Sequence, residues 1–401
     1  MEKSFPKLIR ACTVPQSLMR LLKGQLNYLN QNGFEVISVS SPGELVEVVQ
    51  KNEGIAVREV EMSRQISPFK DFVSLVRMIH LFRKESPLIV HSITPKAGLL
   101  CMLAAKITDV PFRIHTFTGL IFPYKTGFTQ NLLIQMDRVL CWAATHIYPE
   151  GEGVKNDLIE YKITNKSLKV IANGNVNGID TSYFNPKNYT QQQNQDLRKQ
   201  LGIQEKDFVF IFVGRLVGDK GINELVKAFS LISNHSKKSL SSGEEFRERL
   251  KLLLVGAQES ELDPLSQETL EEIESNPNII TTGFQADVRP YFAIANALAF
   301  PSYREGFPNV VMQAGAMGLP CIVTNINGCN EIIEEGRNGL IIPPKETEAL
   351  QKAMKRLVED SNLQHQLKSQ SREMITSRYE QKVVWEALLE EYRRLLRDIP
   401  S

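Results

Sequence analysis

The feature that most constrains the fold of this chain is a repeated alternation of short apolar runs with longer amphipathic segments. In the first third of the sequence, four runs are typical of buried strands: residues 7–14, 34–40, 87–93 and 112–117. Between them, residues 69–85 carry apolar side chains near helical spacing, namely Phe69, Phe72, Val73, Val76, Ile79 and Leu81. Strands that alternate with helices indicate βαβ units and a parallel sheet.

The alternation stops once, at ANGNVNGIDTSYFNP (172–186), where Gly, Asn and Pro are dense, as is typical of turns between domains. It then resumes with five further strand-like runs: 207–214, 251–256, 278–283, 297–302 and 321–325. The prediction is an α/β protein with two Rossmann-like, doubly wound domains, residues 1–180 and 181–378, followed by an amphipathic helix within 379–401. Residues 234–249 are predicted to form an exposed loop and a helix end. On open α/β sheets, ligands bind beyond the carboxyl ends of the strands, so site residues are expected there.

Composition and charge exclude several classes of protein. The net charge of +1 over 401 residues argues against a general nucleic-acid binder. The first 150 residues hold 17 Lys and Arg against 12 Asp and Glu, which is either scatter or a weak attraction to an anionic surface. Five cysteines without a Cys-x-x-Cys motif fit a reduced, cytosolic setting. The sequence shows no signal peptide and no long uncharged apolar stretch, so any membrane contact is expected to be peripheral.

The stretch FVGRLVGDKGINELVKAF (212–229) contains the first candidate ligand-binding loop. A strand is predicted to end before Gly214, which lets the chain turn, and Arg215 and Lys220 follow. A helix is predicted to start near Gly221. Because Arg binds phosphate bidentately and Lys adds a point charge, this loop is typical of an anion site. The alternative is a solvated loop with two surface cations.

The second candidate loop is PSYREGFP (301–308), which follows a predicted strand and carries Ser302 and Glu305. Pro308 suits the first turn of a helix, which is predicted to begin near Asn309. The N–H groups at such a helix start bind phosphate or sugar oxygens, and Glu305 is suited to accept hydrogen bonds from sugar hydroxyls. The alternative for Glu305 is an acid that only stabilises the helix dipole.

These two loops together carry a resemblance to a known family. The pattern GR…KG, followed by PSYREGFP and an apolar helix, resembles the nucleotide-sugar half of a family 4 glycosyltransferase, which has the GT-B fold. ANGNVNGIDTSYFNP resembles that family's linker, and LLLVG, TTGFQADVRPYFAIANALAFPSY and GLPCIVTNINGCNEII fall in the family's order. HSITPKAGLLCMLAAKITDVPFRIHTFTG (91–119) resembles bacterial members that build capsule or lipopolysaccharide repeat units.

The resemblance implies a donor site in the second domain. Arg215 and Lys220 would bind the donor diphosphate, Glu305 would contact sugar hydroxyls, and the backbone amides of residues 307–310 would hold sugar and phosphate oxygens. The loop around Gly283 would pack the base. The expected donor-binding residues are Gly214, Gly283, Phe284, Ser302, Gly306, Phe307, Pro308, Asn309, Val310 and Gln313.

Gln313 is a departure from the family, which usually has a second Glu at this position, in contact with the ribose. A Gln side chain accepts from one hydroxyl and donates to the oxygen of another, so we expect the ribose contact to be kept. The alternative is that Gln313 only lies on a polar helix face.

In the first domain, His115 ends a predicted strand where the family often has a histidine that faces the reacting centre. The alternative is a structural histidine at a strand end, and for His91 a structural hydrogen bond is favoured over a functional role. Residues 12–18 lack the glycines that the family often places after the first strand. Acceptor-side residues are expected in the loop after His115, where a flexible loop without a ligand is the alternative: Thr116, Thr118 and Gly119.

The reaction that the resemblance implies is retaining transfer of a hexosyl or N-acetylhexosaminyl group from a nucleoside diphosphate sugar, with UDP favoured over GDP. The expected acceptor is a lipid-linked saccharide at the cytoplasmic face of the membrane. The implied catalytic residues are His115, Arg215, Lys220 and Glu305, and the final helix would cross back to the first domain. Because the sequence lacks Asp-x-Asp, no metal and no cofactor are expected.

Two other functions remain open from the sequence. A sugar-nucleotide epimerase shares the two-domain architecture and the donor, but turns over without an acceptor. A non-catalytic nucleotide-sugar binding protein would bind the donor without hydrolysis or transfer. A nicotinamide enzyme is disfavoured because no G-x-G-x-x-G follows the first strand.

Overall fold

The structure is a computed structural model that describes residues 5–63, 67–234, 250–259, 261 and 263–398. Contacts between Cα atoms divide the chain into two compact units. The N-terminal unit comprises residues up to Gly178 together with the segment from Gln381, and the C-terminal unit comprises Ile179–Glu380. Each unit is described by itself.

The described part of the N-terminal unit is built on a six-stranded parallel sheet with the order β3-β2-β1-β4-β5-β6. Its strands are β1 (Lys7–Ala11), β2 (Glu35–Ser40), β3 (Ala56–Glu59), β4 (Ile89–Ser92), β5 (Phe112–Phe117) and β6 (His146–Pro149). The central strands are buried on both faces, as expected for a parallel sheet that is covered by helices on both sides.

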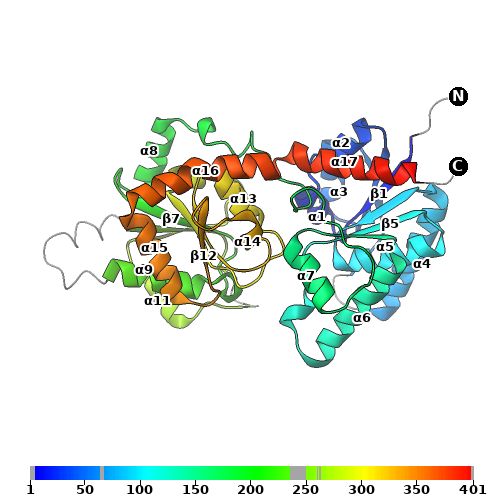
Figure 1. Ribbon diagram of the computed structural model, residues 1–401, viewed down its shortest axis with the longest axis horizontal. Coiled ribbons are helices and arrows are strands. Elements are labelled where there is room, and N and C mark those ends of the chain that lie inside the picture. Colours follow the sequence, from blue (N-terminus) through cyan, green and yellow to red (C-terminus); the bar gives the residue numbers. More distant parts are fainter. Residues whose placement is uncertain (1–4, 64–66, 235–249, 260, 262, 399–401) are drawn as a thin grey trace. The chain divides into compact units, whose positions relative to one another are not determined.

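Helices cover both faces of this sheet (Figure 1). The first four are α1 (Pro15–Leu21), α2 (Gln25–Gln31), α3 (Leu45–Glu53) and α4 (Pro68–Glu85). The others are α5 (Pro95–Ile107), η1 (Phe122–Tyr124), α6 (Gly127–Ala143), α7 (Glu152–Glu160) and α17 (Gln381–Arg397). One apolar core unites the sheet with α4, α5 and α6, and a second unites it with α1, α2, α3 and α17.

The C-terminal unit repeats this plan, with a described six-stranded sheet in the order β12-β11-β10-β7-β8-β9. The strands are β7 (Phe208–Val213), β8 (Leu250–Val255), β9 (Ile279–Gly283), β10 (Ala297–Phe300), β11 (Cys321–Thr324) and β12 (Gly339–Ile342). All described pairings are parallel.

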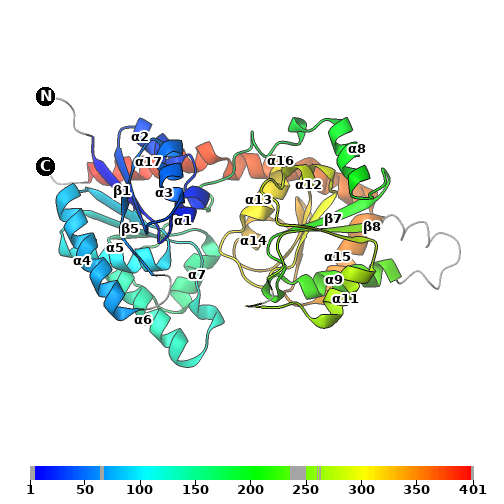
Figure 2. The ribbon, with the colours of Figure 1, turned by 180° about the vertical axis from the view of Figure 1, so that it is seen from behind.

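Helices also cover both faces of the second sheet, as Figure 2 shows from behind. They are η2 (Pro186–Asn188), α8 (Gln191–Gln200), η3 (Gly218–Lys220), α9 (Ile222–Asn234), α11 (Gln267–Ser275) and α12 (Arg289–Ile294). After β10 come α13 (Asn309–Ala316), α14 (Cys329–Ile332), α15 (Thr347–Glu359) and α16 (Ser361–Tyr379). A single buried cluster runs through this unit from Ile179 to Tyr379.

The predicted α/β class is confirmed, and each strand predicted from an apolar run is present, with ends that differ by a few residues. Three strands were not predicted: β3, β6 and β12. All three lie at sheet edges and have four residues each, so their apolar signal is weak. Residues 235–249, most of the segment predicted as an exposed loop and helix end, lie outside the described residues.

The five cysteines are all buried, and none of them forms a disulfide. No helix in the described part of the chain combines the length and the apolar character needed to span a bilayer.

Candidate functional site

The loop between β7 and α9 is held against the loop after β10 by a close backbone contact. Gly221 has φ +70°, and a Cβ atom there would lie 2.1 Å from the Pro301 carbonyl oxygen. Only glycine fits this position, because both the left-handed backbone and the lack of space exclude a side chain. The contact brings the predicted cation Lys220 to the predicted acid-bearing loop.

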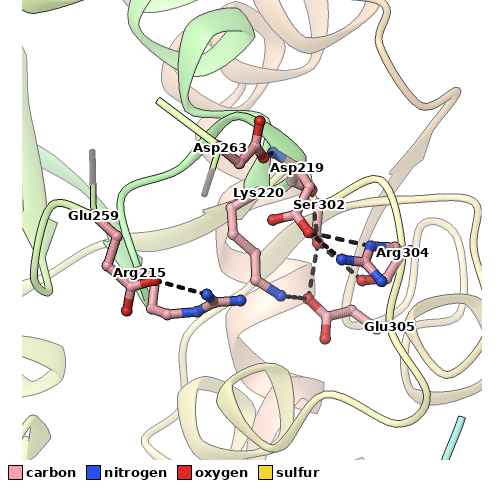
Figure 3. Close-up of polar contacts among 8 residues, drawn as sticks. All are labelled: Arg215, Asp219, Lys220, Glu259, Asp263, Ser302, Arg304 and Glu305. Carbon is pink, nitrogen blue, oxygen red and sulfur yellow. Dashed lines mark hydrogen bonds and ion pairs between the residues drawn. The ribbon is translucent and has the colours of Figure 1, made fainter. Parts of the chain in front are cut away.

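Lys220 and Glu305 form an ion pair across these two loops, with Nζ 2.5 Å from Oε1 (Figure 3). The same carboxylate oxygen accepts a hydrogen bond of 2.8 Å from the Ser302 hydroxyl. Both charged side chains are partly buried, and Ser302 is fully buried. Ser302 was expected among the donor-binding residues, but its burial favours a role in orienting Glu305.

A second ion pair joins the same two loops. Arg304 donates to Asp219 Oδ2 from Nη2 at 2.8 Å and from Nε at 3.1 Å. The Asp219 backbone N–H donates to the Asp263 carboxylate at 2.5 Å, and the Tyr303 N–H donates to the Asp219 carbonyl at 2.9 Å. Asp219 and Asp263 were not predicted as site residues, because no local sequence pattern shows that they meet this loop.

Arg215 lies in the same loop as Lys220 but is more exposed. Its Nη1 atom lies 2.8 Å from Glu259 Oε2. About half of the Arg215 side chain is exposed in this ion pair. Figure 3 shows Arg215 and Lys220 on one side of the loop, with Glu305 next to the lysine ammonium. Both predicted diphosphate-binding cations thus lie in the loop after β7, and each forms an ion pair with a carboxylate.

The backbone from Gly306 to Pro308 packs against the turn that precedes α14. Gly328 has φ +73°, and a Cβ atom there would lie 2.4 Å from the Gly306 carbonyl oxygen. The Thr324 hydroxyl donates to the Ser302 carbonyl. The loop therefore reaches α13 in one defined conformation, which depends on Gly328 and Thr324, two residues that no sequence motif predicted.

Helix α13 begins at Asn309, with Pro308 in an extended conformation as its N-cap instead of in the first turn. The helix geometry directs the amides of its first turn, which include Val310, out of the N-terminal end. Phe307 is buried, with its ring 5.5 Å from that of Tyr379, so only its backbone is suited to ligand contact. Gln313 is partly exposed. Its side-chain amide makes no hydrogen bond to the described residues.

Two further loops lie at the same end of the C-terminal sheet, where the carboxyl ends of its strands meet. A Cβ atom on Gly256, after β8, would lie 1.7 Å from the Gly214 carbonyl oxygen, so these two loops touch. Gly283 ends β9 with φ +68°, and the Phe284 ring that follows is largely exposed. An exposed aromatic ring after a strand is suited to stacking on a flat ring, as the base contact requires.

In the N-terminal unit, His115 is buried within β5, two residues before the strand ends at Phe117. Its Nδ1 atom lies 2.9 Å from the Ser92 hydroxyl, and its ring meets the Phe117 ring edge-on at 4.6 Å. A Cβ atom on Gly98 would lie 2.4 Å from the imidazole, so α5 approaches the ring closely. Burial lowers the pKa of His115 to about 3, which leaves the ring neutral at pH 7.

Thr116 does not share the environment of His115, although the two residues are adjacent. Its hydroxyl lies 2.8 Å from His91 Nε2, in a buried network with Arg10 and Tyr392. Successive side chains of a strand point to opposite faces, so one face receives His115 and the other receives Thr116. Thr116 and His91 both line a small cavity of the N-terminal unit, so an acceptor-side role for Thr116 stays a prediction, and His91 makes the hydrogen bonds that were favoured for it.

Thr118 and Gly119 follow β5 as a partly exposed loop, with φ +108° at the glycine. They stay candidates for the acceptor side. The structure therefore groups Arg215, Lys220, Ser302 and Glu305 at the carboxyl ends of the strands of the C-terminal unit, and places His115 within β5 of the N-terminal unit.

Comparisons with known proteins agree with these two units. Residues 193–374 match the family "Glycosyl transferases group 1", and residues 16–150 match "Glycosyl transferase 4-like". The capsular polysaccharide biosynthesis glycosyltransferase CapM of Staphylococcus aureus is 32% identical over 393 residues, which cover 98% of each chain.

Two further relatives carry more detailed names. The UDP-Gal:alpha-D-GlcNAc-diphosphoundecaprenol alpha-1,3-galactosyltransferase of Escherichia coli is 27% identical over 305 residues, 75% of this chain and 74% of that one. The crystal structure of Anabaena Alr3699/HepE in complex with UDP matches with a TM-score of 0.79 at 17% identity, over 97% of this chain and 100% of that one. The fold and the whole-length similarity to CapM show that this chain belongs to the family 4 glycosyltransferases, with the GT-B fold.

Proposed function

We propose that this glycosyltransferase moves a sugar from a nucleoside diphosphate sugar, with UDP as the nucleotide, to a lipid-linked saccharide during synthesis of a cell-surface polysaccharide. The observation that carries the proposal is the Lys220–Glu305 pair between the loops after β7 and β10. It sets a cation for phosphate beside a carboxylate for sugar hydroxyls. The names of CapM and of the Escherichia coli galactosyltransferase support the pathway, the UDP sugar and the lipid-linked acceptor.

Lys220 and Arg215 would act on the leaving group. As the bond between the sugar C1 and the phosphate oxygen breaks, negative charge grows on the diphosphate, and preorganised cations stabilise that charge. In this structure, Glu305 forms an ion pair with Lys220, and Glu259 forms one with Arg215. A bound diphosphate would compete for both of them, and Glu305 would then be available to accept hydrogen bonds from the sugar.

The acceptor side would be formed by the end of β5. The neutral His115 ring and the loop residues Thr118 and Gly119 would hold the acceptor and orient its hydroxyl. Transfer is proposed to occur with retention: the acceptor oxygen bonds to C1 on the face that the phosphate leaves. The hydroxyl proton passes to the departing phosphate oxygen, and no protein nucleophile is assigned.

The protein would supply the positive charge for the diphosphate without a metal ion. The sequence contains no Asp-x-Asp motif, and Arg215 and Lys220 are the cations proposed to bind the diphosphate. The reaction would take place at the cytoplasmic face of the membrane, where both a nucleotide sugar and a lipid-linked saccharide would be accessible.

A panel of nucleotide sugars tests the proposal. A donor held at 100 times its dissociation constant stabilises the protein by about 2.7 kcal/mol, so thermal shift identifies the sugar nucleotide. The donor that is found is then incubated with a polyprenyl-diphosphate saccharide, with and without chelator. Transfer that requires the acceptor and survives the chelator is the expected result. Donor conversion without acceptor would indicate an epimerase, and a loss of activity that Mn²⁺ or Mg²⁺ restores would contradict the metal-free mechanism.

A further inference from the structure

Arg10 is a fully buried cation in the middle of the N-terminal sheet. It lies on β1 in register with His91 of β4, and it reaches α17. Its Nη1 atom donates hydrogen bonds to His91 Nδ1 at 2.8 Å and to the hydroxyl of Tyr392. Its Nε and Nη2 atoms are buried as well, but they have no hydrogen-bond partner among the described residues. A buried charge with unused donors is strongly unfavourable unless an opposite charge joins it.

No carboxylate in the described part of the chain forms an ion pair with Arg10. Glu391 of α17 forms ion pairs with Lys169 and Arg394 instead. His91 adds no charge, because burial, and to a smaller extent the neighbouring Arg10 cation, hold its pKa well below the ordinary value. A guanidinium stays charged in a protein interior, so Arg10 carries a positive charge without a counter-charge from these side chains.

The two unused atoms of Arg10 form one edge of its guanidinium. Nε–H and one Nη2–H point the same way, in a fork that binds an anion through two hydrogen bonds. Other arginines of this chain use the same two atoms to bind a carboxylate: Arg289, Arg304 and Arg394. The unused edge of Arg10 is therefore suited to an anion.

Arg10 also lines a small cavity that lies within the N-terminal unit. The cavity is bordered by the sheet, by residues after β6 and by α17, and Thr116, Asn175 and Leu388 are among its lining residues. Its volume is about 20 Å³. About 10–15 Å³ suffices for one water-sized group, so the cavity holds a monatomic ion but not a phosphate or a carboxylate.

We propose that Arg10 binds a chloride ion in this cavity. The ion would accept hydrogen bonds from Nε and Nη2 and neutralise the guanidinium. Because His91 Nδ1 accepts from Arg10, its Nε2–H donates to the Thr116 oxygen at 2.8 Å, which leaves the Thr116 hydroxyl proton as a third donor. Glu150 also lines the cavity, and its carboxylate would oppose the ion. The inference is independent of the proposed reaction, since it concerns neither donor nor acceptor.

Thermal unfolding of the full chain in chloride tests this inference. Sodium chloride replaces sodium gluconate at constant ionic strength, because gluconate is too large for the cavity. Chloride at ten times its dissociation constant should multiply the ratio of folded to unfolded protein about elevenfold, and bromide should act in the same way. Arg10→Gln should abolish this dependence, whereas Glu150→Gln should lower the chloride concentration at which it begins.

Arg113→Gln is the matched control, because this arginine of β5 donates only to backbone carbonyls of Ala143 and Val110. It should respond to chloride like the wild type. An equal response in Arg10→Gln would overturn the inference. A wild type without a response, combined with a Glu150→Gln variant that gains one, would also overturn it and would assign the counter-charge of Arg10 to Glu150.

Bromide in crystals of the wild type gives a second measurement, which does not require Arg10→Gln to fold. Anomalous scattering should locate one bromide within hydrogen-bonding distance of Arg10 Nε and Nη2. Bromide at exposed surface positions alone would mean an adventitious ion only, and would contradict the proposed site.

Discussion

The ammonium group of Lys220 contacts the carboxylate of Glu305 at 2.5 Å, although 85 residues separate them along the chain. The contact joins the two loops that the sequence indicates as phosphate-binding and sugar-binding. An ion pair with both members partly buried is sensitive to the loss of either partner, because the charge left behind is incompletely solvated.

Replacement of Lys220 is expected to reduce turnover more than donor binding. Lys220→Ala should cost roughly 2–4 kcal/mol of transition-state stabilisation, the range for one preorganised charge donor. The same substitution at Lys352, on α15, serves as the control, because its pair with Glu348 is exposed. Single-turnover rates at saturating donor provide the measurement, and a wild-type rate in Lys220→Ala would remove this residue from the site.

Asp219 is expected to act by position, without touching the donor. Asp219→Asn keeps the shape but loses the charge that holds Arg304, so the loop with Glu305 becomes less ordered. We expect donor KM to rise by about three- to thirtyfold, equivalent to roughly 1–2 kcal/mol, with a smaller change in kcat. Asp219→Glu should recover part of the loss. If Asn and Glu variants both had wild-type KM values, the pair with Arg304 would be irrelevant to binding.

His115 is expected to serve transfer and not donor binding. His115→Gln keeps a hydrogen-bonding group next to Ser92 and should lower transfer about a hundredfold, as for the loss of a group that positions the reacting atoms, while UDP affinity stays unchanged. Because burial holds the pKa of this histidine at about 3, it does not titrate between pH 5 and 8. Any limb of the pH–rate profile in that window should therefore be the same in wild type and variant.

Calorimetry with UDP separates the two explanations for His115. A variant that loses UDP binding in parallel with transfer, or that unfolds at a much lower temperature, would indicate a structural histidine that only supports β5.

Glu391 is expected to stabilise the N-terminal unit near neutral pH and to lose this effect in acid. Burial would raise the pKa of this carboxyl, but hydrogen bonds from Arg394, Lys169 and Tyr148 outweigh it and hold the pKa at about 2, below the ordinary 4.5. A depressed carboxyl pKa stabilises the folded state above pH 4.5, and this contribution is lost as the pH falls toward 2.

Glu391→Gln should lower the free energy of unfolding at pH 7 by about 1–3 kcal/mol, as for removal of a charged hydrogen-bond acceptor. The difference between wild type and variant should shrink between pH 4.5 and pH 2 in denaturant titrations. Glu390→Gln, at the exposed neighbouring position, should follow the wild type throughout. A difference that stayed constant over this range would contradict the assignment.

Much of the fold and part of the candidate site follow from local pattern. Strand ends placed Lys220 and Glu305 at the same sheet edge, because parallel strands share an end. The alternation of side chains along β5 also separates His115 from Thr116, a signal that is already present in the sequence. The pairs Asp219–Arg304 and Gly328–Gly306 could not be predicted, since both join segments that only tertiary packing brings together.

Helix α4 illustrates a different limit. Its apolar spacing predicts a helix correctly but does not tell which face meets the sheet, because apolar residues occur on both sides. The buried face turned out to contain Ser74, and the phenylalanines of its first two turns lie outside. The ion pairs of Asp71 and Glu85 with Lys96 and Lys7 agree with this inner side.

Gln313 is expected to bind the ribose, one turn into α13 from the loop that would hold the donor sugar. Its amide makes no hydrogen bond to the described part of the chain, so a ligand would not have to displace a partner. A Gln accepts from one ribose hydroxyl and donates to the oxygen of the other, and it adds no negative charge near a diphosphate. Gln313→Ala should weaken UDP binding by roughly 1–3 kcal/mol, because the ribose hydroxyls lose their partner.

Gln313→Glu separates this contact from a merely polar helix face. A carboxylate forms stronger hydrogen bonds with the hydroxyls but repels the diphosphate, so UDP affinity should change by no more than about 1 kcal/mol and transfer should persist. Repulsion between charges is screened by salt, so the affinity of the Glu variant should gain on the wild type as ionic strength rises. Calorimetry with UDP at low and high salt measures both effects. An alanine variant that binds UDP as tightly as the wild type would show that Gln313 lies outside the site.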